Sequence, residues 1–480
     1  MGSSEITKKT KFLANFKGTF PQVFAAISGT LFAISDGMTY GWTAPFIPYL
    51  ISEDSHLKTT KYEAEFLETA LLVGSFCGLP VTIYLVDKIG RKMSLLLASF
   101  VVFIAWIVIA LGNRIEYIFV ARFACGMSGN MAFVAAPMFL AEIADQKIRG
   151  FLSSIIYVMM LLGCVIVYCV GPYLPFYVPS IIGAGVAIVE LLTFSRVPES
   201  PLYLLYKGKP EKSMESLKYY KPYIDVAKEM SEMVDILEKQ QQHKGKWTDL
   251  ITVGSNRKAI LIMTVLNAGQ HLCAYSVILM NLHLILKSAG SVYMDSSIAA
   301  ILFSVLMLAA ATFASLQIDK YGRKVLLIFS SFITGICLLA IAVYFHFKET
   351  GYDVMTVSWI PIVSVMIYAA AFKIGVGLVP IVVTAEIFPT DLKAFGMTMS
   401  DAMFIVGGII ALQLYQWMTY VYGLYPPFYV FAVCSFFITV FTICFVPETK
   451  GKTLDEIQSI LKGDKSCKIP KIAEEKVCAS

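Results

Sequence analysis

Long apolar runs alternate with short polar ones along most of the chain, and the apolar runs have the length of membrane-spanning helices. A helix needs about 20 mostly apolar residues to cross a bilayer. Such runs predict twelve spans, at residues 20–49, 64–86, 93–112, 117–141, 151–172, 177–197, 258–286, 296–318, 325–347, 357–385, 394–421 and 427–446. Their order is six spans, a polar stretch and six more spans.

The polar stretch that separates the two sets of spans is rich in lysine and glutamate and has helical spacing in parts. It is too polar to lie in a bilayer. We therefore predict an all-α membrane protein with twelve transmembrane helices in two six-helix bundles and a cytoplasmic helical insert. The expected parts are a cytoplasmic tail at 1–19, an N-terminal bundle at 20–197, the linker at 198–257, a C-terminal bundle at 258–447 and a second cytoplasmic tail at 448–480.

The amino-acid composition argues against a soluble protein. Hydrophobic residues make up 57% of the 480 residues and charged residues only 15%, whereas about 25% charged residues is usual for soluble chains. So few polar groups would not cover the surface of a soluble protein of this length. The net charge of +5 is ordinary and does not indicate a nucleic-acid partner.

Motifs of enzyme or metal chemistry are absent from the sequence. It has no Walker motif, no nucleophile elbow and no paired Cys/His spacing typical of zinc. Most of the ten cysteines fall within apolar runs, where free cysteine behaves as a small hydrophobic residue. We expect no enzyme activity, no cofactor and no metal, and the sequence leaves the oligomeric state open.

The basic residues predict how the chain is oriented. Lysine and arginine gather in VDKIGRK (86–92), in IDKYGRK (318–324), in the polar insert and in both termini. Because the number of spans is even, all of these segments fall on one side of the bilayer. Basic loops usually face the cytoplasm. We therefore predict a multi-pass protein of the cell membrane with both termini in the cytoplasm.

Three motifs occur twice, in the same order and at matching positions in the two halves. DKIGRK follows the second span and DKYGRK the eighth; AEIADQKIRG and AEIFPTDLKAFG follow the fourth and tenth; VPES and VPET close the sixth and twelfth. Duplicated halves are typical of carriers whose two bundles rock about a central site. The charges in these motifs are candidates for a latch between the open states, although short cytoplasmic loops are often basic for reasons of topology alone.

The sequence resembles the major facilitator superfamily and, within it, the sugar porter family. The likeness covers nearly the whole chain and rests on GWTAP (41–45), DKIGRK, PESPLYL from Pro198, DKYGRK, AEIFP and PETKGKTLDEI from Pro447. GWTAP most resembles the insect trehalose- and glucose-transporter-like members. The resemblance implies alternating access and a salt-bridge network that is intact when the cavity opens outward and broken when it opens inward. It assigns that network to Asp87, Arg91, Glu142, Arg149, Glu199, Asp319, Arg323, Glu386, Lys393 and Glu448.

The expected sugar site departs from the family pattern. Span seven has Gly269, Gln270 and Tyr275 where the family usually has two glutamines and an asparagine, and span ten has Lys373 where many members have glutamate. Each buried sugar hydroxyl needs a hydrogen-bond partner, because an unpaired one costs about 1–3 kcal/mol. The predicted substrate-binding residues are Gln270, Tyr275, Tyr157, Lys373 and Asp36.

The resemblance implies a carrier that moves a sugar or a related small solute by alternating access, with facilitated diffusion favoured over proton coupling. Asp36, Glu190 and Asp401 are the candidate proton sites if coupling occurs. Two alternatives stay open because of the altered site. One is a carrier of a less polar, non-sugar solute, and the other is a transporter-like receptor or regulator that does not transport.

Lys373 lies in the middle of an apolar span, where an unpaired lysine costs on the order of 3 kcal/mol. Helix rise places Lys373 about 18 Å and Asp36 about 22 Å from the cytoplasmic ends of their spans. In the family, spans one and ten both line the central cavity. We therefore predict that Asp36 and Lys373 pair across the cavity, directly or through water or solute. The alternative is a lysine that faces a wet cavity without a fixed partner.

Overall fold

The computed structural model describes residues 19–145, 148–222, 225–242, 248–389, 392–452 and 454–462. Throughout these ranges the regular secondary structure is helical, and the all-α prediction is confirmed. Ten helical segments are long and apolar enough to cross a membrane. Span five adds an apolar helix, and span one is divided among shorter helices, so each of the twelve predicted spans is helical.

The N-terminal half contains spans one to six. Span one consists of a helix at 19–29, α2 (Leu31–Gly41) and α3 (Thr43–Leu50); the next five are α4 (Lys61–Ile89), α5 (Arg91–Leu111), α6 (Ile115–Ile143), α7 (Arg149–Val170) and α8 (Tyr177–Phe194). The linker that follows forms α9 (Pro201–Tyr206), α10 (Pro210–Tyr220), α11 (Val226–Gln242) and α12 (Asp249–Thr252).

The C-terminal half contains spans seven to twelve and a short helix after them. Its helices are α13 (Gly254–Leu272) and α14 (Tyr275–Ala289), α15 (Ser296–Tyr321), α16 (Arg323–Glu349), the 3-10 turn η1 (Met355–Val357), α17 (Ile360–Ile374) and α18 (Val379–Ile387), α19 (Lys393–Tyr422), α20 (Tyr425–Phe445) and α21 (Leu454–Lys462). Spans seven and ten are each made of two helices in line.

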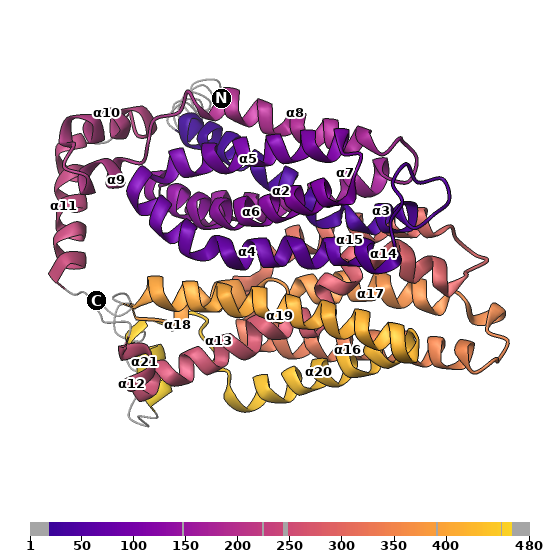
Figure 1. The fold of residues 1–480 in the computed structure, drawn as a ribbon. Helices are drawn as coiled ribbons and strands as arrows, with labels where there is room; N and C mark the ends of the chain where they lie inside the picture. The colour runs from indigo at the N-terminus through magenta and orange to yellow at the C-terminus, as the bar shows by residue number, and fades with distance from the viewer. Residues whose placement is uncertain are drawn as a thin grey trace, which may run out of the picture.

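The two halves lie side by side, and the linker helices α9 to α11 run past one end of the pair (Figure 1). The short helices α12 and α21 lie at the same end, which we call the linker end. The opposite end, where α3 and the start of α4 lie, we call the loop end. The helices of each half run between these two ends.

Breaks in the helices set the geometry of the centre. Span seven breaks at Ala274, which has the left-handed φ of 67°. Span ten breaks between Ile374 and Val379, where Gly375 packs so closely that an added Cβ would lie 2.3 Å from the carbonyl oxygen of Leu326. Broken membrane helices are typical of transporter binding sites, because they free backbone and side-chain groups at the membrane centre.

Spans one and five are in backbone contact. A Cβ added to Gly37 of α2 would lie 1.8 Å from the carbonyl oxygen of Met160, and one added to Gly163 of α7 would lie 2.0 Å from that of Ile34. Small residues at such crossings let membrane helices approach closely and gain van der Waals contact. The contact therefore fixes α2 against α7.

The halves touch each other through the helix pairs α3/α14, α4/α19, α7/α15 and α2/α14. Where the structure describes both partners, the hydrogen bonds that cross between the halves lie toward the loop end. One runs from the Tyr168 hydroxyl to the carbonyl oxygen of Leu279, and another from the Asn281 amide to the Glu68 carboxylate at 3.0 Å. The structure is thus closed at the loop end.

Candidate functional site

The two breaks bring Lys373 and Tyr275 together at the centre. Lys373 lies in the last turn of α17, just before the break in span ten, and Tyr275 is the first residue of α14, just after the break in span seven. The Lys373 ammonium nitrogen lies 4.5 Å from the centre of the Tyr275 ring and 3.4 Å from its hydroxyl oxygen. This is a cation–π contact. The Tyr275 ring also stacks on Phe372, with 5.1 Å between ring centres.

Asp36 approaches the same centre from the N-terminal half. One of its carboxylate oxygens would lie 2.3 Å from a Cβ added to Gly129, so α6 passes directly beside it. Asp36 and Lys373 both lie near the Cys164 thiol of α7, which donates to the carbonyl oxygen of Gly37, the residue after Asp36. Among the described side chains neither has an ion-pair partner within 4 Å, so the predicted pair is not formed directly in this conformation. A pair bridged by water or solute stays a prediction.

Tyr157 and Gln270 complete the predicted set. Asp36 and Tyr157 lie near the Tyr275 hydroxyl, and Lys373 lies over the Tyr275 ring, so four of the five predicted residues form one central group. Gln270 is buried in α13 and donates a hydrogen bond to the Asn267 side chain at 3.3 Å.

His271 also lies in this central group, although it was not among the residues predicted from the sequence. It is fully buried, its Nδ1 lies 3.0 Å from the Ser276 hydroxyl, and its ring centre lies 4.2 Å from that of Phe404. It interacts electrostatically with Lys373. Its place next to Gln270 was the available signal, but a lone histidine in a packed helix is more often structural.

A second polar cluster joins the halves at the loop end, and we call it the loop-end clasp. It consists of Glu68 and Thr69 of α4, Asn281 of α14, and Gln413 and Gln416 of α19. Glu68 is fully buried, and one of its oxygens accepts from Asn281 at 3.0 Å and from Gln416 at 3.4 Å. Gln413 donates to the Thr69 hydroxyl at 2.8 Å.

A buried arginine of span four, Arg122, lies next to the loop-end clasp. Arg122 donates to the carbonyl oxygens of Thr39 and Leu67, lies 5.6 Å from the Trp42 ring, and interacts electrostatically with Glu68. Glu68 was not among the residues predicted from the sequence. Its signal was an acid inside an apolar span, which usually faces protein or a cavity.

At the linker end, the described ion pairs of the predicted network hold each half together. Arg91 lies 3.1 Å from Glu142 and 4.0 Å from Asp87, and Arg323 lies 2.9 Å from Glu386. Each of these pairs stays within one half. The side chains of Arg149, Asp319 and Lys393 lie outside the part of the chain that the structure describes. A link between the halves at this end therefore stays a prediction.

The glutamates of VPES and VPET have the same structural role in both halves. Glu199 accepts hydrogen bonds from the backbone N–H of Lys92, and Glu448 accepts from those of Arg323 and Lys324 at 2.9 and 3.0 Å. Helix α5 begins directly after Gly90 and helix α16 directly after Gly322, and both glycines have a positive φ. The repeated motifs thus place a carboxylate on the N-terminus of a helix, which its dipole favours.

The two capping carboxylates differ in their surroundings. Burial raises the pKa of Glu199 above its ordinary value, and the backbone N–H of Ser200 and Lys92 offsets only part of this effect. Burial also acts to raise the pKa of Glu448, but the backbone N–H groups of Lys450, Arg323 and Lys324 outweigh it, so the pKa of Glu448 is lowered.

The two caps are expected to respond to pH in opposite directions. A lowered pKa stabilises the fold above the ordinary value of 4.5 and the effect is lost as pH falls, whereas a raised pKa adds stability as pH falls toward that value. Glu448→Gln should cost about 1 kcal/mol at pH 7.5 after solvent screening. The difference in Tm between wild type and Glu448→Gln should shrink below pH 4.5. Wild type should gain Tm relative to Glu199→Gln as pH falls from 7.5 toward 4.5.

Thermal unfolding of the purified protein in detergent, followed by intrinsic fluorescence between pH 7.5 and about 3, measures both differences. Parallel pH dependences of the two variants would contradict the assignment.

Comparison with known proteins decides the family. The profile of the family described as "Sugar (and other) transporter" matches residues 22–461. The chain belongs to this sugar (and other) transporter family. Members of the family are transporters, which supports a membrane carrier and not an enzyme. The predicted family is confirmed, and the receptor alternative is not favoured.

Similar members include insect proteins. The chain is 27% identical over 452 residues to the facilitated trehalose transporter Tret1 of Polypedilum vanderplanki, covering 92% of this chain and 88% of that protein. It is 26% identical over 442 residues to Tret1 of Bombyx mori, covering 91% and 86%.

Solved structures share the fold. The proton:xylose symporter XylE bound to 6-bromo-6-deoxy-D-glucose matches with a TM-score of 0.72 and 21% identity, covering 92% of this chain and 98% of that one. Inward-open XylE from E. coli matches with a TM-score of 0.74. The twelve-helix fold of the major facilitator superfamily is therefore confirmed.

Proposed function

We propose that this protein carries a sugar across a cell membrane by facilitated diffusion. The observation that carries the proposal is the central group of Asp36, Tyr157, Tyr275 and Lys373, which both halves build around the breaks in spans seven and ten. Aromatic rings can stack on a sugar face, and the polar atoms of these residues can bond its hydroxyls. The insect relatives are named as facilitated trehalose transporters, so trehalose is the first sugar to test.

The linker end faces the cytoplasm in this proposal, with both termini on that side. The support is the basic sequence of the segments at this end, since basic loops usually stay in the cytoplasm. A carrier that is closed at the loop end would then face inward. Opening to the outside requires the loop-end clasp to separate and the linker end to close.

Uptake into vesicles tests the proposal. Purified protein in liposomes is expected to take up labelled trehalose or glucose saturably without a proton gradient, and Tyr275→Ala should reduce the uptake. Specific sugar binding without flux would favour a receptor. Flux that needs an imposed proton gradient would favour symport, and no response to any sugar would favour a less polar solute.

Gln270→Ala is expected to weaken sugar binding more than His271→Ala, by about tenfold. An amide offers both a donor and an acceptor to sugar hydroxyls, and a lost partner costs about 1–3 kcal/mol. The Nδ1 atom of His271 already pairs with Ser276, and its ring packs on Phe404. Binding of labelled sugar to the two purified variants measures the order, and the reverse order would contradict the proposed role of Gln270.

A further inference from the structure

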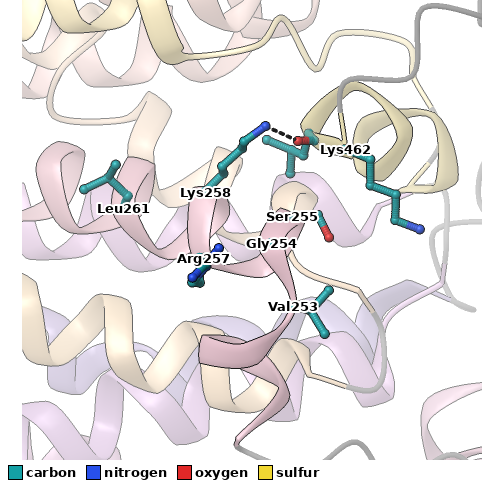
Figure 2. Close-up of a pocket in the computed structure, with 8 residues that line it drawn as sticks. Val253, Gly254, Ser255, Arg257, Lys258, Leu261 and Lys462 are labelled. Atoms are coloured by element: carbon teal, nitrogen blue, oxygen red, sulfur yellow. Dashed lines mark hydrogen bonds between the residues drawn. The ribbon is translucent and has the colours of Figure 1, made fainter.

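A cavity at the linker end lies between the start of α13 and the end of α21 (Figure 2). Its volume is about 390 Å³, and it is lined by Val253, Gly254, Ser255, Arg257, Lys258, Leu261, Leu461 and Lys462. Three of these eight residues are cationic and none is acidic. The central group and the loop-end clasp use none of them.

One of the three cations, Lys258, has a structural role. The Lys258 ammonium group donates to the carbonyl oxygen of Leu461 at 2.8 Å and so fastens α21 to α13 (Figure 2). Arg257 and Lys462 have no acidic partner within 4 Å among the described residues. Two positive charges at this cavity are therefore left for a ligand.

The backbone adds to the positive character of the cavity. Val253 is the N-cap of α13, Gly254 and Ser255 begin its first turn, and the N-cap residue makes no side-chain hydrogen bond to this turn. The N-terminus of a helix carries a partial positive charge and free N–H groups that suit an anion. The cationic side chains and this turn line the same space.

Apolar surface borders the cavity on the membrane side. Leu261, one turn farther along the membrane span, is 53% exposed, and Ile251 and Val253 just before the span are 59% and 41% exposed. A span begins at Gly254, so the cavity lies where a bilayer's headgroups meet its hydrocarbon core. A free phosphate would use the charges but not this apolar border.

We propose that the cavity binds the phosphate headgroup of an anionic phospholipid. The headgroup lies between Arg257, Lys462 and the first turn of α13, and an acyl chain runs along Leu261. Basic pockets at the cytoplasmic ends of membrane helices are suited to such lipids. The occupant is a lipid of the surrounding membrane, independent of the solute carried.

Occupancy would act on the two broken spans. Lys258 fastens α21 to α13, and Gln458 of α21 donates to the carbonyl oxygen of Ile387 in α18 at 2.7 Å. Helices α13 and α18 are the linker-end pieces of spans seven and ten. A lipid between α13 and α21 therefore stabilises the positions of α13 and α18, and its removal makes both helices more mobile.

The test compares retained lipid in two double variants. Protein is purified from vesicles of equal phosphatidylglycerol and phosphatidylcholine, and the lipid that stays bound is counted by native mass spectrometry. Arg257→Gln with Lys462→Gln should lower retained phosphatidylglycerol about tenfold relative to wild type. The control, Lys212→Gln with Lys218→Gln on the exposed face of α10, makes the same charge change at the linker end and should not lower it.

Equal retention in wild type and the Arg257/Lys462 variant, or an equal loss in the control, would overturn the proposal. So would a Tm of lipid-free protein that inorganic phosphate alone raises as much as phosphatidylglycerol does. Should the double variant fail to fold, Lys462→Gln alone keeps the test, because this residue lies exposed in the last turn of α21 and is expected to give a smaller loss.

Discussion

Glu68→Ala is expected to open the loop end and shift the carrier toward its outward-facing state. The Glu68 carboxylate accepts hydrogen bonds from Asn281 and Gln416 of the other half. The buried Asn281 amide would lose its acceptor, which costs about 1–3 kcal/mol, whereas Gln416 keeps its bond to the carbonyl oxygen of Glu65. The loss at Asn281 alone favours the open state by about tenfold. Glu68→Gln keeps an acceptor oxygen and should shift the balance much less.

Spin labels at the loop end measure this opening. Tyr62 of α4 and Tyr420 of α19 are 77% and 87% exposed and lie at the loop ends of two contacting helices from opposite halves. Both are replaced by labelled cysteine in a background without native cysteines. Longer distances should dominate in Glu68→Ala but not in Glu68→Gln. An unchanged distance distribution in Glu68→Ala would show that the clasp does not hold the loop end closed.

Exchanging the charges of Asp36 and Lys373 is expected to restore transport that either single change abolishes. Lys373→Asp places two acids at the membrane centre and Asp36→Lys places two bases there, and unbalanced charge in this region is costly. Each single variant should lose at least about tenfold in uptake, equivalent to 1.4 kcal/mol. The double variant again places one acid and one base near Cys164 and so restores the balance of charge at the membrane centre.

Uptake is compared at equal surface expression of the three variants. A double variant no better than the poorer single one would refute the pairing, including the form bridged by solute. Asp401 would then be the next partner to exchange, because it lies near Tyr157 of the same central group.

The sequence predicted the spans because length and hydropathy are local properties of the chain. It also predicted which motifs correspond in the two halves, and Glu199 and Glu448 indeed cap equivalent helices. The break at Ala274 was not predictable in this way, since alanine carries no signal for a left-handed turn. Depth estimates that assume straight spans therefore do not give the contact of Lys373 with Tyr275.

The loop-end clasp shows a second limit. Glu68, Asn281 and Gln416 come from three helices in two halves, and their meeting depends on how the halves are placed. Sequence reasoning could mark Glu68 as an acid in an apolar span, but nothing local names its partners. The same holds for Arg257 and Lys462, which share a cavity only because α21 folds back on α13.

The close contacts of Gly37 with Met160 and of Gly163 with Ile34 limit how this carrier can adapt to another substrate. With backbone touching backbone, α2 and α7 form one stiff wall, and Asp36 and Tyr157 cannot move apart to suit a larger solute. The opposite wall is built from short pieces, since Tyr275 and Lys373 each stand at the end of a broken helix. Adaptation to a new solute is therefore expected to proceed through substitutions in the C-terminal half. The N-terminal wall keeps its position and limits the size of the solute that fits.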